Sequence, residues 1–165
     1  MTPITEAQIR ASFVNASRKE VSDLSLPAGF AEIDWDRLEF LGWRDRKLPQ
    51  RSYVVTTVGE RLVGVLLKRA DATPRSRAQC TWCQDVELAD DVVFYSARLA
   101  GAAGRKGDTI GTLCCADFGC SFNARKRPPA VYLGFDVEAA RQQRIAGLRE
   151  RVSGFAAAVL GDTDG

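Results

Sequence analysis

Cys80-Thr81-Trp82-Cys83 and Cys115-Ala116-Asp117-Phe118-Gly119-Cys120 contain four of the five cysteines of this 165-residue chain. Each stretch brings two thiols within a few residues of one another, so each pair can chelate a single metal ion. Zn²⁺ prefers four tetrahedral sulfur or nitrogen ligands, and the chain has no histidine. The spacing therefore predicts an all-sulfur zinc site, with Cys80, Cys83, Cys115 and Cys120 as its ligands.

Two other interpretations of the cysteines stay open at this point. Buried cysteines are common core residues, and a CxxC pair can be a redox dithiol. Redox pairs of the thioredoxin type occur at a strand-to-helix turn, whereas here a polar loop precedes Cys80 and acidic turn residues follow Cys83. A site closed by four thiolates has no open position for a substrate, which indicates a structural role for the metal.

Cys114 and Cys115 are adjacent, so the third ligand has to be chosen between them. Residues 109–114 have the pattern of a strand, in which neighbouring side chains alternate between faces. We expect Asp117 to cap the following helix and Cys120 to lie in its first turn, where the helix N-terminus stabilises a thiolate. Cys115 is the predicted ligand and Cys114 a buried free thiol, with the exchange of the two as the alternative.

The first 70 residues are expected to form a helix, an aromatic segment and a hairpin. Thr5 and Gln8 form a capping box that starts a helix extending to about Ser25. The aromatic-rich stretch 34–45 is predicted to be one short helix that ends at Gly42. Residues 52–58 and 61–69 alternate around Gly59-Glu60 and predict a β-hairpin.

The second half predicts a smaller hairpin and two helices. Strands at 92–99 and 109–114 flank a glycine-rich basic loop at 101–108, and a short helix follows at 117–125. Asp136 caps a long terminal helix that ends at Gly161, and its apolar stripe is expected in the core: Ile145, Leu148, Val152, Phe155 and Val159. The predicted fold is α+β, a treble-clef zinc finger with β-hairpins, an N-terminal helix and a long C-terminal helix. We expect residues 1–70 to pack on a zinc domain of residues 71–165 as one compact unit.

Composition limits the possible functions. Hydrophobic residues make up 45% and charged residues 27%, which is ordinary for a globular protein, and the net charge of +2 is small. The lack of histidine removes Ser-His-Asp and Cys-His catalysis, so we expect no enzyme. The first ten residues lack the pattern of a signal peptide and no apolar run could span a bilayer, so we expect a monomer in the reducing cytoplasm without membrane contact.

Several motifs in order resemble a known family. FLGWRD at 40–45, CTWC at 80–83, SARLAGAAGRKGDTIGTLCCADFGCS at 96–121 and the terminal helix are similar to the FBP-type elongation factor G-binding proteins, relatives of the fusidic acid resistance proteins FusB and FusC. The resemblance covers nearly the whole chain, from IRASFVNAS at 9–17 onward. FusB-type proteins carry a helical bundle ahead of the zinc domain, where this chain offers one predicted helix and the aromatic segment.

The resemblance implies a C-terminal treble-clef zinc finger, with the family's ligands at Cys80, Cys83, Cys115 and Cys120. It also implies a cytoplasmic, ribosome-associated protein that binds elongation factor G; in the resistance members, binding promotes release of the factor from a ribosome stalled by the drug.

The family presents aromatic and basic residues beside the zinc site to the factor. By position, the candidates for partner contact are Trp82, Arg98, Arg105 and Arg125. Packing inside the protein is an equal interpretation of Trp82, and basic residues near the thiolates can simply offset their charge. The alternative function is an RNA- or ribosome-binding zinc module that uses Arg98, Arg105, Lys106 and residues 125–127.

Overall fold

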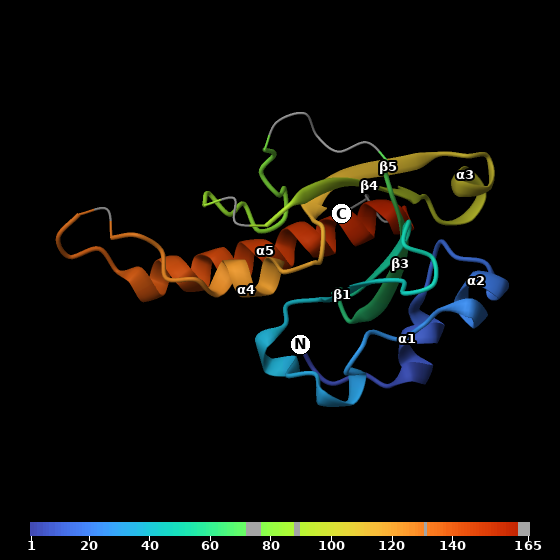
Figure 1. The fold of residues 1–165 in the computed structure, drawn as a ribbon, viewed down its shortest axis with the longest axis horizontal. Coiled ribbons are helices and arrows are strands. Elements are labelled where there is room, and N and C mark those ends of the chain that lie inside the picture. Colours follow the sequence, from blue (N-terminus) through green and yellow to red (C-terminus); the bar gives the residue numbers. More distant parts are fainter. Residues whose placement is uncertain (72–76, 88–89, 131, 162–165) are drawn as a thin grey trace.

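One antiparallel sheet forms the centre of the molecule (Figure 1). A computed structural model describes residues 1–71, 77–87, 90–130 and 132–161. The strands follow the order β1-β2-β3-β4-β5. Their bounds are Leu41–Arg44, Arg51–Val58, Arg61–Arg69, Val92–Arg98 and Thr109–Cys115. The pairing of β3 with β4, at Lys68↔Ser96 and Arg69↔Tyr95, makes the sheet continuous between the two halves of the chain.

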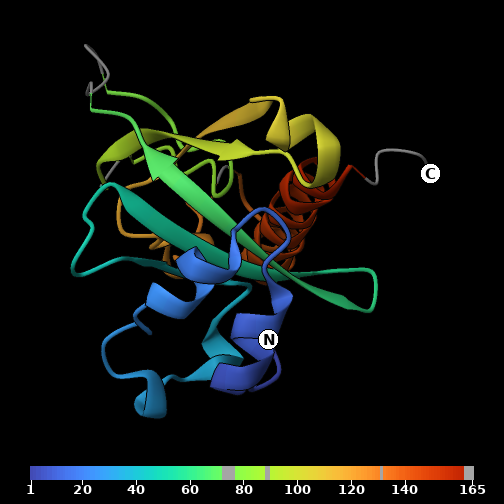
Figure 2. The ribbon, with the colours of Figure 1, turned by 90° about the vertical axis from the view of Figure 1, so that its right-hand side faces the viewer.

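Helices cover both faces of this sheet. On one side lie α1 (Glu6–Ser12), α2 (Arg18–Asp23) and the 3₁₀ turns η1 (Phe30–Glu32) and η2 (Trp35–Arg37); later in the chain come α3 (Gly101–Arg105), α4 (Cys120–Arg125) and α5 (Val137–Leu160). Figure 2 shows the sheet between the N-terminal helices and α5. The α+β class and the long C-terminal helix are confirmed.

The core consists of two clusters, one on each face of the sheet, because successive side chains of a strand point to opposite faces. On β2, Val54 points into a cluster with α5 and the cysteines, while Tyr53 and Val55 point into a cluster with Ile9 of α1 and Trp43 of β1. The cysteines therefore belong to the larger core, which α5 closes.

The N-terminal helix is shorter than the sequence predicted. The capping box of Thr5 and Gln8 is present, but α1 ends at Ser12. Phe13 then adopts an extended conformation and bridges to Gly64 of β3, and the Val14 N–H donates to the Gly64 carbonyl at 3.0 Å. This contact to the sheet interrupts the helical pattern, and a second capping box restarts the chain as α2.

The aromatic segment was also predicted wrongly as one short helix. It contains η2 and then β1, whose residues Leu41 and Trp43 pair with Val55 and Tyr53 of β2. The residues of β1 alternate between buried and half-buried, as expected for a strand, and the pairing with β2 supplies backbone partners that no local pattern reveals.

The remaining elements lie close to their predicted bounds. The hairpin of β2 and β3 turns at Gly59, which has a φ of 58°, and β4 and β5 are present. The glycine-rich loop contains the short helix α3. In α5, Asp136 accepts a hydrogen bond from the Ala139 N–H at 2.9 Å, Gly161 ends the helix, and all five predicted stripe residues are buried. None of the described helices has the length and apolar content needed to cross a bilayer.

Candidate metal centre

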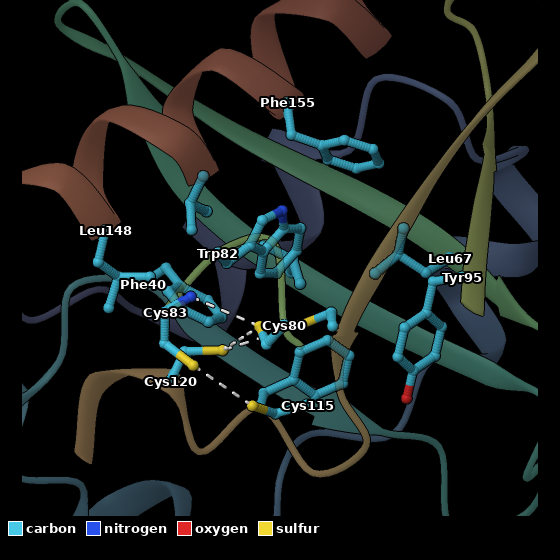
Figure 3. Close-up of a cluster of buried hydrophobic side chains, with 14 of the residues drawn as sticks. Phe40, Leu67, Cys80, Trp82, Cys83, Tyr95, Cys115, Cys120, Leu148 and Phe155 are labelled. Carbon is cyan, nitrogen blue, oxygen red and sulfur yellow. Dashed lines mark hydrogen bonds between the residues drawn. The ribbon is translucent and has the colours of Figure 1, made fainter. Parts of the chain in front are cut away.

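Four cysteine sulfurs meet beneath α5 (Figure 3). The Sγ atoms of Cys80, Cys83, Cys115 and Cys120 all lie within 4.8 Å of one another, and all four residues are buried. The Sγ–Sγ distance is 3.6 Å both for Cys80 with Cys120 and for Cys83 with Cys115. Tetrahedral coordination with Zn–S bonds of about 2.3 Å separates sulfurs by about 3.8 Å. The four cysteines are thus positioned to bind a metal ion, and the donor set and spacing fit Zn²⁺.

Two reversals of the chain bring the ligand pairs together. After Cys83, Gln84 has a φ of 53°, and its N–H donates to the Cys80 carbonyl at 3.0 Å. Before Cys120, Phe118 has a φ of 57°, and its N–H donates to the Cys115 carbonyl at 3.1 Å. Left-handed backbone is unfavourable for residues other than glycine, so local strain is concentrated at the cluster.

Backbone contacts hold the first turn against β5. The Thr81 N–H donates to the Leu113 carbonyl at 2.9 Å, and the Thr81 hydroxyl lies 2.9 Å from that of Thr112. Cys120 is the first residue of α4, as expected, but Gly119 rather than Asp117 is its N-cap. The side chain of Asp117 instead pairs with Arg44 of β1 at 3.3 Å, so the predicted cap at Asp117 is wrong.

The negative charge of four buried thiolates would need a cation to balance it. Hydrogen bonds from neighbouring thiols lower the pKa of Cys80 and Cys83. The pKa of Cys115 is raised mainly by its contact with Cys120, and the pKa of Cys120 mainly by its contact with Cys114. Four like charges at this spacing cannot all persist in a buried site without an opposite charge. A divalent metal ion would replace the protons and compensate the thiolates.

Cys114 lies next to the four but outside the group. Its Sγ is 3.8 Å from that of Cys120, and its side chain is completely buried. Burial raises the pKa of Cys114 well above the ordinary thiol value. The residue is therefore suited to remain a neutral thiol beside the cluster.

Asn123 is a site residue that the sequence analysis missed. Its Nδ2 lies 3.8 Å from the Sγ of Cys83, 3.7 Å from that of Cys115 and 2.7 Å from Oδ2 of Asp90. An amide donor beside two thiolates stabilises their charge and orients them. Its place three residues after Cys120, on the same face of a short helix, is the signal that could have identified it.

Trp82 lies inside the protein, with 2% of its surface exposed. Its ring meets that of Phe40 edge-on at 5.4 Å and that of Phe155 at 5.5 Å (Figure 3). The Arg151 guanidinium donates to its carbonyl at 2.6 Å. Of the two interpretations of Trp82, packing inside the protein is the one the structure shows, because α5 and the segment before β1 both pack over it.

The three arginines proposed for partner contact lie on two separate parts of the surface. Arg125 forms an ion pair with the buried carboxylate of Glu39, and Arg98 pairs with Glu20 at 2.9 Å. Arg105 of α3 is exposed. Arg98 and Arg105 line one hollow and Arg125 lines another, so the structure does not bring the predicted set into a single patch.

A CxxC turn, the β4–β5 hairpin carrying a third thiol, and a helix beginning at the fourth define a treble-clef zinc finger. The sequence matches the model of the FBP C-terminal treble-clef zinc-finger family over residues 8–159, and the chain belongs to this family.

The fold is also similar to that of the fusidic acid resistance protein FusC, with a TM-score of 0.56 and 19% sequence identity. The match covers 74% of this chain and 53% of FusC, so the chain corresponds to about half of that protein. A comparison with proteins of curated function gives no match.

Proposed function

We propose that this protein binds elongation factor G and promotes its release from the ribosome, with Zn²⁺ held by Cys80, Cys83, Cys115 and Cys120 as a structural clamp. Membership of the FBP zinc-finger family and the motifs shared with its elongation factor G-binding members support this role. A closed four-thiolate site shapes a surface and leaves no position for a substrate. The role needs no catalytic residue, and it places the protein in the cytoplasm, where thiols stay reduced.

The observation that carries the proposal is an exposed aromatic ring on the ligand-bearing helix. Phe122 follows Cys120 by two positions in α4, and 64% of its surface is exposed. The Nζ of Lys126 lies 5.8 Å from the centre of its ring. An aromatic side chain with a cationic neighbour is typical of the residues that dominate protein interfaces.

A hollow beside Phe122 could receive a side chain of the factor. It has a volume of about 510 Å³. Apolar side chains line it, among them Ile33, Leu38 and Leu41, and Arg37 is also part of the lining. The metal site fixes α4, and α4 holds Phe122 at the border of this hollow. Phe122 therefore takes the role that the sequence analysis gave to Trp82.

Binding between the purified zinc-loaded protein and elongation factor G tests the proposal. We expect Phe122→Ala to weaken binding about tenfold or more, as removal of an interface anchor does. Phe94→Ala is the matched control, because Phe94 is 43% exposed and lies on β4, away from α4. No complex at micromolar concentrations, or equal losses in both variants, would contradict the proposal.

Bound factor should dissociate faster from the ribosome when the protein is present. The protein would bind better to the conformation of the factor that precedes dissociation and so shift the population toward it. The dissociation rate of labelled factor, measured with wild type and with Phe122→Ala, checks this step. An unchanged rate with saturating wild-type protein would limit the function to binding.

A further inference from the structure

The helices α2 and α3 lie at the same end of the molecule, away from α4 (Figure 1). Figure 2 faces this end, where the loop that joins α1 to α2 passes near α3. The Asn15 amide in that loop donates to the Arg98 carbonyl at 2.9 Å, which fixes the loop against the end of β4. This end is thus a defined surface built from two distant segments of the chain.

Arg98 lines two hollows at this end. One, of about 320 Å³, lies between residues 14–17 and 98–105, and Arg105 lines it. The other, of about 220 Å³, is lined by Arg51 and Lys68. Arg98 belongs to the lining of both, and we call the two hollows together the track; their polar lining includes Asn15, Ser17, Glu20, Gln50, Ser96 and Thr109.

The cations of this end are largely free. Across the described part of the chain, the ion pairs do not include five exposed basic residues here: Arg18, Lys19, Lys68, Arg105 and Lys106. Of the nearby acids, Glu20 is engaged by Arg98 and Arg51, and Asp71 accepts from the Gln50 amide, which leaves Asp23 and Asp108. By contrast, Arg125 and Lys126 beside α4 are paired with carboxylates. The track therefore presents an excess of positive charge despite the small net charge of the chain.

Glycines give α3 its compact shape. A Cβ on Gly104 would lie 1.7 Å from the carbonyl oxygen of Leu99, and Gly101 and Gly107 have φ values of 66° and 101°. A side chain at Gly104 would displace the backbone, and the positive φ values of Gly101 and Gly107 favour glycine. The tight turn therefore holds Arg105 and Lys106 beside the hollow at Arg98.

We propose that this track binds the phosphodiester backbone of RNA, at a surface separate from the one proposed for elongation factor G. Arginine, lysine, serine, threonine and asparagine are the side chains that contact phosphates and sugars. The exposed large apolar residues of the described chain line neither hollow, so an aromatic-anchored protein interface or an inserting membrane surface fits less well. Without aromatic platforms for stacking, the track reads the backbone and is insensitive to base sequence.

Fluorescence anisotropy with a labelled single-stranded RNA of about 20 nucleotides tests this proposal on the zinc-loaded full chain. We expect Arg105→Gln/Lys106→Gln to weaken binding at least fivefold. Each lost phosphate contact should reduce the slope of log K against log salt by about 0.7, so this variant should lose about 1.4. Arg46→Gln/Lys47→Gln removes the same charge from exposed positions between β1 and β2, and should change binding less than twofold.

Three results would overturn the proposal: no RNA binding by wild type at low salt, equal losses in the two double variants, or equal affinity for a DNA strand of the same sequence. The DNA arm tests contact with the 2′-hydroxyl, which distinguishes RNA. Elongation factor G binding is measured on the same variants. Retained factor binding by Arg105→Gln/Lys106→Gln separates the two surfaces, and loss of factor binding with RNA binding intact would assign the track to an acidic protein instead.

Discussion

Glu39 and Arg149 form an ion pair across 110 positions of the chain, and the Glu39 carboxylate has no exposed surface. The same carboxylate pairs with Arg125 of α4. The Glu39 N–H also donates to the Ser121 hydroxyl at 3.0 Å. One buried acid before β1 thus connects the N-terminal segment to both helices that follow the cysteine cluster.

This pairing predicts that loss of the two arginines destabilises the protein more than loss of the acid they bind. Glu39→Gln removes the buried charge and leaves two arginines that can turn to solvent, so it should cost about 1–3 kcal/mol. Arg125→Gln/Arg149→Gln leaves the carboxylate buried without a partner and should cost about 3–5 kcal/mol. Urea denaturation of the zinc-loaded protein measures both. Arg141→Gln, which breaks an exposed pair with Glu138, is the control and should change stability by less than about 0.5 kcal/mol.

Adjacent cysteines should differ in their effect on zinc. Cys115 belongs to the group of four sulfurs, whereas Cys114 lies beside it, and burial raises the pKa of its thiol. We expect Cys115→Ser to release zinc and Cys114→Ser to retain about one ion per chain, as measured by metal analysis after dialysis. The opposite pattern would exchange their roles. Removal of zinc by a chelator should unfold the region around α4, because binding energy of a structural zinc is folding energy.

The ring of Phe118 leaves no room for a side chain at Gly42 of β1. A Cβ on Gly42 would lie 2.6 Å from Cγ of Phe118, which stacks on Tyr95 at 5.2 Å. Gly42→Ala should therefore displace the turn that precedes Cys120 and destabilise the protein by about 1–3 kcal/mol. Thermal unfolding measures the loss. Gly154→Ala is the control, because no atom lies within 4 Å of its added Cβ, and in α5 it should stabilise slightly.

At Gln84 we expect a substitution to glycine to stabilise the protein. Its φ of 53° is strained for a residue with a Cβ, and its side chain is exposed. Gln84→Gly should relieve this strain and stabilise the protein by about 0.5–1 kcal/mol, after the greater entropy of glycine in the unfolded state is counted. Denaturation midpoints with zinc in excess test the sign. A loss of stability would show that the Gln84 side chain contributes more than the backbone strain costs.

Local patterns predicted the parts of the fold that depend on local interactions. The spacing of the cysteines located the cluster, and the apolar stripe of α5 together with its caps located the terminal helix. The cysteine spacing and the stripe of α5 each depend on residues a few positions apart, and tertiary packing does not change the structure that they predict.

The errors occurred where distant contacts decide. The helix α1 ends before Phe13 because Phe13 forms a β-bridge with Gly64 of β3. Residues 41–44 form a strand because they pair with β2. Trp82 is buried because Phe40 and Phe155, from opposite ends of the chain, cover it. The sequence contains these residues but not their proximity, so the cysteine cluster could be predicted from spacing whereas the burial of Trp82 could not.

Tyr53 and Asp45 should control how stability depends on pH. The Tyr53 hydroxyl donates to Oδ2 of Asp45 at 2.7 Å within the core. Burial, followed by this hydrogen bond, raises the pKa of Tyr53 well above 10.0. Burial alone would raise the pKa of Asp45, but hydrogen bonds from Tyr53 and from the N–H groups of Lys47 and Leu48 hold it below 3.8.

The sign of each effect follows from linkage. The folded state favours neutral Tyr53, so this contribution is present below pH 10 and lost above it; it favours charged Asp45, so that contribution is present above about pH 3.8 and lost below it. Tyr53→Phe should cost about 1–3 kcal/mol near pH 7 and flatten both limbs of the stability profile. Tyr132→Phe, at an exposed position, is the control and should leave the profile unchanged. Urea midpoints between pH 3 and pH 11 measure these profiles, and a Tyr53→Phe curve parallel to wild type would show that the pair does not set the pH dependence.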